Sequence, residues 1–179
     1  MRTQYDQGDV QRLIEQLADS IAHAFAADQP LIVVGIRTRG EVLADRLSQL
    51  LSNKGFKQIM RGVLDITLYR DDLSEIGPRP MVRPTELNLD INARPLLLVD
   101  DVFFTGRSVR AALNALIDFG RPSVIRLAVL VERPGRELPI RPDFVALQFQ
   151  SVPADHRINV RLREIDGKDE IVVEPIAHD

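Results

Sequence analysis

Residues 95–108 read PLLLVDDVFFTGRS, an apolar run followed by two acids and a polar loop that contains glycine. The run 95–99 is short and apolar, which is typical of a buried strand, and we expect the strand to end on Asp100 and Asp101. Apolar residues at helical spacing follow in 109–117. The stretch therefore predicts a strand, a short loop and a helix in direct succession.

The segment before this unit shows the same alternation. Periodic apolar residues predict an amphipathic helix over about 9–27, and LIVVGI at 31–36 predicts a buried strand. A polar loop at 37–40 leads to a second expected helix over about 41–52. A further strand is expected within 59–68.

The segment after the unit is richer in strands. The β-branched run 123–131 predicts a strand, and 143–149 predicts a shorter one. We expect 160–165 and 170–173 to form a hairpin around the Asp-Gly turn at 166–167. Strands that alternate with helices give an α/β domain with a largely parallel sheet.

Length and composition narrow the class of protein. The chain has 179 residues, which suits a single domain over residues 1–179. It has no cysteine, which excludes disulfides, thiolate metal sites and cysteine nucleophiles. A net charge of −3 and a pI near 5.7 argue against a general nucleic-acid binder. No apolar run approaches a membrane span and no signal peptide is visible, so a cytoplasmic location is expected.

Acids and a phosphate cradle lie side by side in the unit quoted first. Ligands of parallel sheets bind beyond the carboxyl ends of the strands, where Asp100 and Asp101 are expected. The loop from Thr105 to Ser108 opens a helix, whose unpaired N–H groups and positive dipole end favour a phosphate. Gly106 allows close backbone approach. Because carboxylates suit sugar hydroxyls or a metal rather than a phosphate, the pattern predicts a ribose 5-phosphate site.

Four motifs, in this order along the chain, resemble the PyrR family of pyrimidine operon attenuation regulators with uracil phosphoribosyltransferase activity. The motifs are GIRTRG at 35–40, DITLYRDDL at 65–73, LLVDDVFFTGRS at 97–108 and RELPIR at 136–141. The third motif matches the signature with which type I phosphoribosyltransferases bind 5-phosphoribosyl-1-pyrophosphate (PRPP). The resemblance covers about 10–175.

The resemblance implies a largely parallel central sheet flanked by helices, a small hood at about 133–160 and a flexible lid at about 69–92. It implies a pentosyltransferase that joins uracil to PRPP and gives UMP and pyrophosphate. Mg²⁺ would arrive with PRPP and lie near Asp100 and Asp101, without a side-chain cage of its own. Members of the family form dimers and tetramers, so a homodimer or homotetramer is expected.

The resemblance also implies roles for the matching residues. The expected catalytic residues are Asp100, Asp101, Arg39 and Arg70. The residues expected to bind the 5′-phosphate of PRPP are Phe104, Thr105, Gly106, Arg107 and Ser108. The pyrophosphate loop is Arg37, Thr38, Arg39 and Gly40, with a non-proline cis peptide bond expected before Thr38. The lid begins with Tyr69, Arg70, Asp71 and Asp72, and the hood over the base contains Arg133, Pro134, Gly135 and Arg136.

The sequence departs from the family pattern where members contact messenger RNA. Those members carry Thr, Arg and His on the first helix, a His before RELPIR and a Lys after it. The matching positions here are Glu15, Gln16, Asp19, Gly135 and Leu147. Of the RNA contacts, Arg136 and Arg141 remain. RNA affinity depends on neutralising phosphates, so we expect RNA-dependent regulation to be weakened, absent or moved to another surface.

Other interpretations stay open at this point. One is a nucleotide-sensing RNA-binding regulator in which transferase activity is residual or absent. Purine specificity is another, against which only the pyrimidine-type 65–73 motif argues. A dinucleotide-binding domain fits poorly because no GxGxxG follows the first strand. The three histidines, at 23, 156 and 178, lack metal-ligand spacing.

Overall fold

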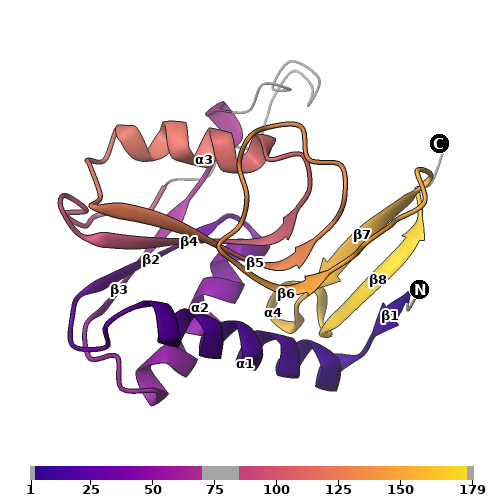
Figure 1. Ribbon diagram of the computed structural model, residues 1–179, viewed down its shortest axis with the longest axis horizontal. Coiled ribbons are helices and arrows are strands. Elements are labelled where there is room, and N and C mark those ends of the chain that lie inside the picture. Colours follow the sequence, from indigo (N-terminus) through magenta and orange to yellow (C-terminus); the bar gives the residue numbers. More distant parts are fainter. Residues whose placement is uncertain (1–2, 70–84, 177–179) are drawn as a thin grey trace.

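Five parallel strands form the central sheet of the computed structural model, which describes residues 3–69 and 85–176 (Figure 1). The order across the sheet is β3-β2-β4-β5-β6. The strands are β2 (Leu31–Ile36), β3 (Ile59–Leu64), β4 (Pro95–Phe103), β5 (Val124–Glu132) and β6 (Phe144–Gln148). Strand β4 therefore lies at the centre, with β2 on one side and β5 on the other.

Helices cover both faces of this sheet. α1 (Gln7–Ala24) and α2 (Arg39–Asn53) pack on one face, and α3 (Arg107–Ile117) packs on the other (Figure 1). Successive side chains of a strand point to opposite faces. Accordingly, Leu97 and Val99 of β4 join the core under α1 and α2, while Leu96 and Leu98 join the core under α3.

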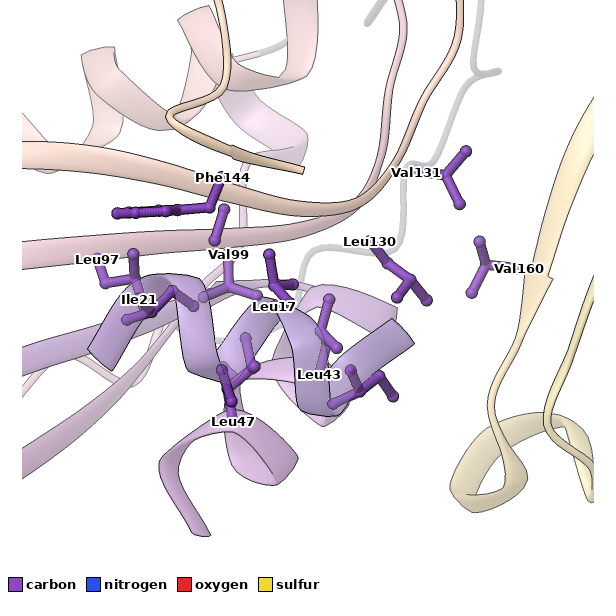
Figure 2. Close-up of a cluster of buried hydrophobic side chains, with 14 of the residues drawn as sticks. Leu17, Ile21, Leu43, Leu47, Leu97, Val99, Leu130, Val131, Phe144 and Val160 are labelled. Carbon is purple, nitrogen blue, oxygen red and sulfur yellow. The ribbon is translucent and has the colours of Figure 1, made fainter. Parts of the chain in front are cut away.

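The larger core lies between the sheet and the two helices α1 and α2. Figure 2 shows Leu17 and Ile21 of α1 with Leu43 and Leu47 of α2, gathered under Leu97 and other side chains of the sheet. Each of these five side chains is at most 1% exposed. The core fixes α2, and with it the loop that precedes α2, against the centre of the sheet.

A second, antiparallel sheet is built from both ends of the described chain. Its order is β1-β8-β7, with β1 (Gln4–Tyr5), β7 (His156–Arg161) and β8 (Glu170–Pro175). The short helix α4 (Arg163–Asp166) connects β7 to β8. Val160 and Ile171 join the core of α1 and α2, so the second sheet packs beside the first. Of the hood expected at 133–160, only residues 156–160 belong to this sheet.

The expected alternation of strands and helices is confirmed, but several boundaries were wrong. β4 does not end on the acids: it continues to Phe103 because Val102 and Phe103 pair with Val131 and Glu132 of β5. α2 begins at Arg39, inside the expected loop. α1 ends at Ala24 rather than Ala27, because Phe25 takes an extended conformation and its ring packs against Phe144.

Two connections also differ from expectation. The strand expected within 59–68 ends at Leu64 and is followed by a 3-10 turn, η1 (Thr67–Tyr69). The hairpin around Asp166 has a helical turn at its end: α4 stops at Gly167, whose φ of 76° is left-handed. The sequence pattern could not indicate α4 because its four residues make little more than one helical turn, which is too short to show a repeated apolar spacing.

The stretch 69–92 is described only in part, since residues 70–84 lie outside the described ranges. Glu86 pairs with Val63 at the edge of β3, with N–O distances of 2.8 and 2.9 Å. Leu87 and Ile91 are buried in the core under α3. Among the described residues, no helix is long and apolar enough to cross a bilayer.

Candidate active site

The two acids lie in the C-terminal part of β4, at the edge of the sheet where ligands of parallel sheets bind. Asp100 is 8% exposed, and its Oδ1 accepts the N–H of Asp101 at 3.0 Å. Asp101 Oδ1 in turn accepts the N–H of Val102 at 2.9 Å. Burial, and then the neighbouring charge of Asp101, raise the pKa of Asp100 well above its usual value. Burial also raises the pKa of Asp101, while the Arg39 charge opposes that rise.

The expected phosphate turn follows β4 directly. Gly106 has a φ of 93°, a left-handed conformation that glycine adopts without strain, and α3 begins at the next residue. Thr105 Oγ1 accepts the N–H of Arg107 at 3.3 Å. A cavity of about 120 Å³ lies at this turn, and its lining includes Asp100, Thr105, Gly106 and Ser108. The first N–H groups of a helix lack intrahelical partners, so this cavity suits a phosphate.

The segment after β5 holds the phosphate turn in place. The carbonyl of Thr105 accepts the N–H groups of Glu137 and Leu138 at 3.0 and 3.2 Å. The Arg107 guanidinium donates from Nε to Glu137 Oε2 at 2.8 Å. The Arg107 side chain is thus engaged with Glu137, and the contribution expected from it at the phosphate would come from its backbone.

The expected pyrophosphate loop, residues 37–40, follows β2 at the same edge of the sheet as this turn. The peptide bond between Arg37 and Thr38 is cis, as expected from the family resemblance. A second cavity of about 270 Å³ is bordered by Thr38 and Arg39, by the acidic pair and by Ser108. Asp100 and Ser108 line both cavities, so the two form adjoining parts of one cleft.

Both arginines of this loop have acidic partners that the sequence did not indicate. Arg39 binds Asp166 of α4 side-on, with Nε–Oδ2 at 3.2 Å and Nη2–Oδ1 at 2.7 Å. Arg37 lies 3.3 Å from Glu41 and 3.1 Å from Glu86, measured between nitrogen and carboxylate oxygen. Of the two arginines, Arg39 interacts electrostatically with Asp101. The hydrogen bond to Asp166, and then this attraction, contribute to the raised pKa of Arg39.

Gly40 explains how closely the loop approaches the acids. A Cβ atom at this residue would lie 2.6 Å from the carbonyl oxygen of Val99 and 3.2 Å from the Cα of Asp100. Both neighbours are backbone atoms of β4, which cannot rotate aside. Only glycine therefore lets α2 begin directly against the strand that carries the acidic pair.

The expected hood residues contact the phosphate turn through Phe104. The Arg133 guanidinium lies over the Phe104 ring, with Cζ 4.0 Å from the centroid. Gly135 has a φ of 124°, and a Cβ atom there would lie 2.2 Å from Phe104 Cε2. Pro134 and Arg136 are exposed, and Arg136 Nη1 donates to the carbonyl of Leu138 at 3.3 Å. The structure thus brings Arg133 and Gly135 to the edge of the cleft.

Of the expected lid residues, only Tyr69 lies within the described part of the chain. Its hydroxyl is hydrogen-bonded to Asp118 at the end of α3, which raises the pKa of Tyr69. Arg70, Asp71 and Asp72 lie outside the described residues. Asp65, the first residue of the 65–73 motif, lines the larger of the two cavities, a role that the sequence pattern did not predict. Its place just after β3, at the same edge of the sheet as Asp100, is the signal that could have identified it.

A match to a family model and matches to individual relatives both indicate a phosphoribosyltransferase. A family model described as "Phosphoribosyl transferase domain" matches residues 2–161. A "Bifunctional protein PyrR" from Roseiflexus sp. (strain RS-1) is 50% identical over 164 residues, covering 90% of this chain and 88% of the relative. The "Bifunctional protein PyrR" of Thermus aquaticus is 47% identical over 165 residues, covering 91% and 90%.

More distant solved structures share the fold. A hypoxanthine phosphoribosyl transferase from Trypanosoma cruzi has a TM-score of 0.71 at 16% identity, covering 96% of this chain and 90% of that one. An HGPRT-ase from Leishmania tarentolae, in complex with GMP, has a TM-score of 0.70 at 15% identity, covering 96% and 95%. The type I phosphoribosyltransferase fold expected from the sequence is therefore confirmed. With close relatives along nine-tenths of its length, the chain belongs to the phosphoribosyl transferase domain family and, within that family, to the PyrR proteins.

Proposed function

We propose that the protein is a uracil phosphoribosyltransferase, which converts uracil and PRPP to UMP and pyrophosphate. The observation that carries the proposal is the pair of adjoining cavities that share Asp100 and Ser108. One cavity lies at the N-terminus of α3 and suits the 5′-phosphate. The other lies between the acids and Arg39 and suits the pyrophosphate. The acids between them fit the ribose that links these two groups in PRPP.

The chemistry follows from the charges along the cleft. As the bond from ribose C1 to the pyrophosphate oxygen breaks, positive charge develops on the ribose ring and negative charge on the leaving group. The carboxylates of Asp100 and Asp101 favour the cationic ring and hold the ribose hydroxyls. Arg39 stabilises the departing pyrophosphate, and Arg70 is expected to assist. A uracil nitrogen bonds to C1 as the pyrophosphate leaves, and the N–H proton of that nitrogen passes to solvent. No general base is evident among the described residues, so positioning supplies most of the rate.

The acidic pair in the cleft suits a magnesium ion that binds together with PRPP. Within the described residues, no cluster of three or more ligating side chains could hold a metal by itself. Asp100 and Asp101 offer the carboxylate oxygens that Mg²⁺ prefers, and Mg²⁺ commonly combines one or two carboxylates with substrate phosphates. The two aspartates would hold it together with PRPP. When bound, Mg²⁺ neutralises part of the pyrophosphate charge.

The direct test is release of pyrophosphate from PRPP in the presence of individual bases. We expect release to require both uracil and Mg²⁺, and to stop when the metal is chelated with EDTA. Adenine, guanine and hypoxanthine serve as matched controls in the same assay. Faster release with hypoxanthine or guanine than with uracil would contradict the proposal and favour the purine interpretation.

A second function, regulation through RNA, is suggested by the word "Bifunctional" in the names of the relatives. Two observations favour a weakened form of it here. On α1, Glu15 and Gln16 are exposed, and Asp19 forms an ion pair with Lys54. In the hood, a side chain at Gly135 would collide with Phe104. Compared with family members that bind RNA, the α1 surface therefore lacks two potential cations and carries two additional acids, and Arg136 and Arg141 are the remaining candidates for RNA contacts.

We therefore expect weak binding to a pyrimidine-leader RNA hairpin at physiological salt, with little dependence on UMP. Few phosphates are neutralised at this surface, so affinity should approach the non-specific range. The measurement is a fluorescence titration of labelled hairpin, with a scrambled RNA and the Arg136→Ala/Arg141→Ala variant as controls. Tight, UMP-dependent binding would contradict the prediction. The homo-oligomer and the cytoplasmic location expected from the sequence stay predictions.

A further inference from the structure

We propose that Asp166 is a positioning residue for the transferase reaction: it fixes the Arg39 guanidinium toward the pyrophosphate of PRPP before that ligand binds. The proposal rests on the proposed function and adds a residue from outside the central sheet to its site. Asp166 belongs to α4, the short helix that connects β7 to β8 in the second sheet. The match to the phosphoribosyl transferase domain model ends at residue 161, before α4 begins.

The side-on geometry leaves much of the Arg39 guanidinium available. A guanidinium has five N–H donors in a fixed plane. Asp166 takes two of them, one on Nε and one on Nη2. The other donors remain for a ligand, and the Arg39 side chain is 37% exposed where it borders the larger cavity. A bidentate partner on one edge thus sets the direction in which the other edge points.

Asp166 is itself held firmly, as a positioning group must be. Its Oδ2 accepts the N–H of Leu162 at 2.8 Å, and its side chain is 17% exposed. The hydrogen bond from Arg39 keeps the pKa of Asp166 below its usual value, so the carboxylate is charged at neutral pH.

A separate set of ion pairs fixes the α4 turn to α2, the helix that begins with Arg39. Arg46 of α2 donates from Nε to Glu164 at 3.0 Å and from Nη1 to Asp169 at 2.9 Å. Asp169 also accepts the N–H of Arg163 at 2.8 Å. Arg46 binds a residue on each side of Asp166, so the α4 turn that carries Asp166 is held against α2, the helix that carries Arg39.

Fixing Arg39 in advance has a consequence for affinity. A long arginine side chain loses rotamer freedom when a ligand immobilises it, and this loss weakens binding. A residue that has already ordered the side chain removes that penalty. We expect loss of Asp166 to weaken binding of Mg²⁺-pyrophosphate by about 5- to 10-fold, with a similar rise in the KM for PRPP.

The test compares Asp166→Asn with wild type by calorimetry with Mg²⁺-pyrophosphate, and by steady-state kinetics with PRPP and uracil. Asparagine can still accept the Leu162 N–H, so the turn is preserved while the charge is lost. Asp155→Asn is the matched control: it removes an exposed carboxylate that is hydrogen-bonded to His156, away from the cleft and the α4 turn, and it should leave pyrophosphate binding unchanged. Asp166→Glu keeps the carboxylate and should restore part of the affinity.

A double-mutant comparison separates positioning from a general structural role. In an Arg39→Ala background, Asp166→Asn should weaken pyrophosphate binding no further, because its effect passes through Arg39. Wild-type binding by Asp166→Asn, or tighter binding, would overturn the inference, since tighter binding would mean that Asp166 competes with the ligand. A further loss in the Arg39→Ala background would also overturn it. Should Asp166→Asn fail to fold, the same comparison is made with Asp166→Glu.

The outcome is independent of whether uracil is the substrate. Pyrophosphate binding is measured without any base, so a protein inert toward uracil can still confirm or overturn the role of Asp166. Conversely, normal uracil transfer by the wild type beside unchanged pyrophosphate binding by Asp166→Asn would retain the proposed function and reject the positioning role.

Discussion

Asp100→Asn is expected to lower kcat by about 100-fold or more, while raising the thermal midpoint of the ligand-free protein. Activity falls because the variant loses a carboxylate that holds the ribose and favours its cationic transition state. Stability rises because Asp100 is a buried acid beside a second acid, and asparagine removes its charge without a change of shape. Asparagine can also retain the hydrogen bond from the N–H of Asp101.

The pH dependence of this effect has a definite sign. The pKa of Asp100 in the folded protein is raised well above 3.8, so the unfolded chain ionises this carboxyl first as the pH rises. The stability contributed by the protonated carboxyl is complete below pH 3.8 and is lost as the pH rises through the higher folded-state pKa. The variant does not ionise at this position and escapes that loss.

Thermal unfolding of both proteins over a pH series measures the effect. The difference between the two midpoints should widen as the pH rises above the ordinary aspartate range. Asp28→Asn, which removes an exposed carboxylate outside the cleft, is the control for the loss of one negative charge. An Asp100→Asn variant that is fully active, or one that melts lower at neutral pH, would be incompatible with a buried, ligand-facing acid.

Gly40→Ala is expected to raise the KM for PRPP at least about 10-fold and to lower the free energy of unfolding by about 1–3 kcal/mol. The added methyl group would meet the carbonyl oxygen of Val99 at 2.6 Å. Since that oxygen belongs to the central strand, the start of α2 must shift instead. Arg39, one residue earlier, would move with it and leave its place beside the acids.

Gly8→Ala is a suitable control for this experiment. Gly8 lies in the first turn of α1, and a Cβ atom there would make only ordinary contacts, the nearest at 3.4 Å. Alanine favours a helix more than glycine does, so this variant should be neutral or slightly more stable. Kinetics and chemical denaturation of both variants check the prediction, and unchanged PRPP kinetics in Gly40→Ala would refute the close-approach argument.

The sequence predicted those parts of the site that are contiguous along the chain. A strand, two acids and a glycine-containing turn before a helix indicate a phosphate and sugar site by themselves, because each residue is placed by its immediate neighbours. The cis bond before Thr38 was also expected, although from resemblance rather than from any local physical signal. The structure contains both features.

Contacts between distant residues could not be predicted in this way. Arg39 and Asp166 are 127 positions apart, and no local pattern in either segment indicates the other. The apolar run predicts a strand that ends on the two acids, whereas pairing with β5 extends β4 through them to Phe103. The constraint at Gly135 likewise depends on the ring of Phe104, which arrives from another part of the chain.

The pairing of β1 with β8 ties the beginning of the chain to the catalytic cleft. Gln4 and Tyr5 lie opposite Val172 and Ile171, and the Gln4 side chain donates to Glu170 at 2.9 Å. Strand β8 starts four residues after Asp166. Removal of the first five residues would thus delete β1, the edge strand of the sheet that supports Asp166. Such a truncation should weaken the placement of Arg39 and therefore the binding of the pyrophosphate group.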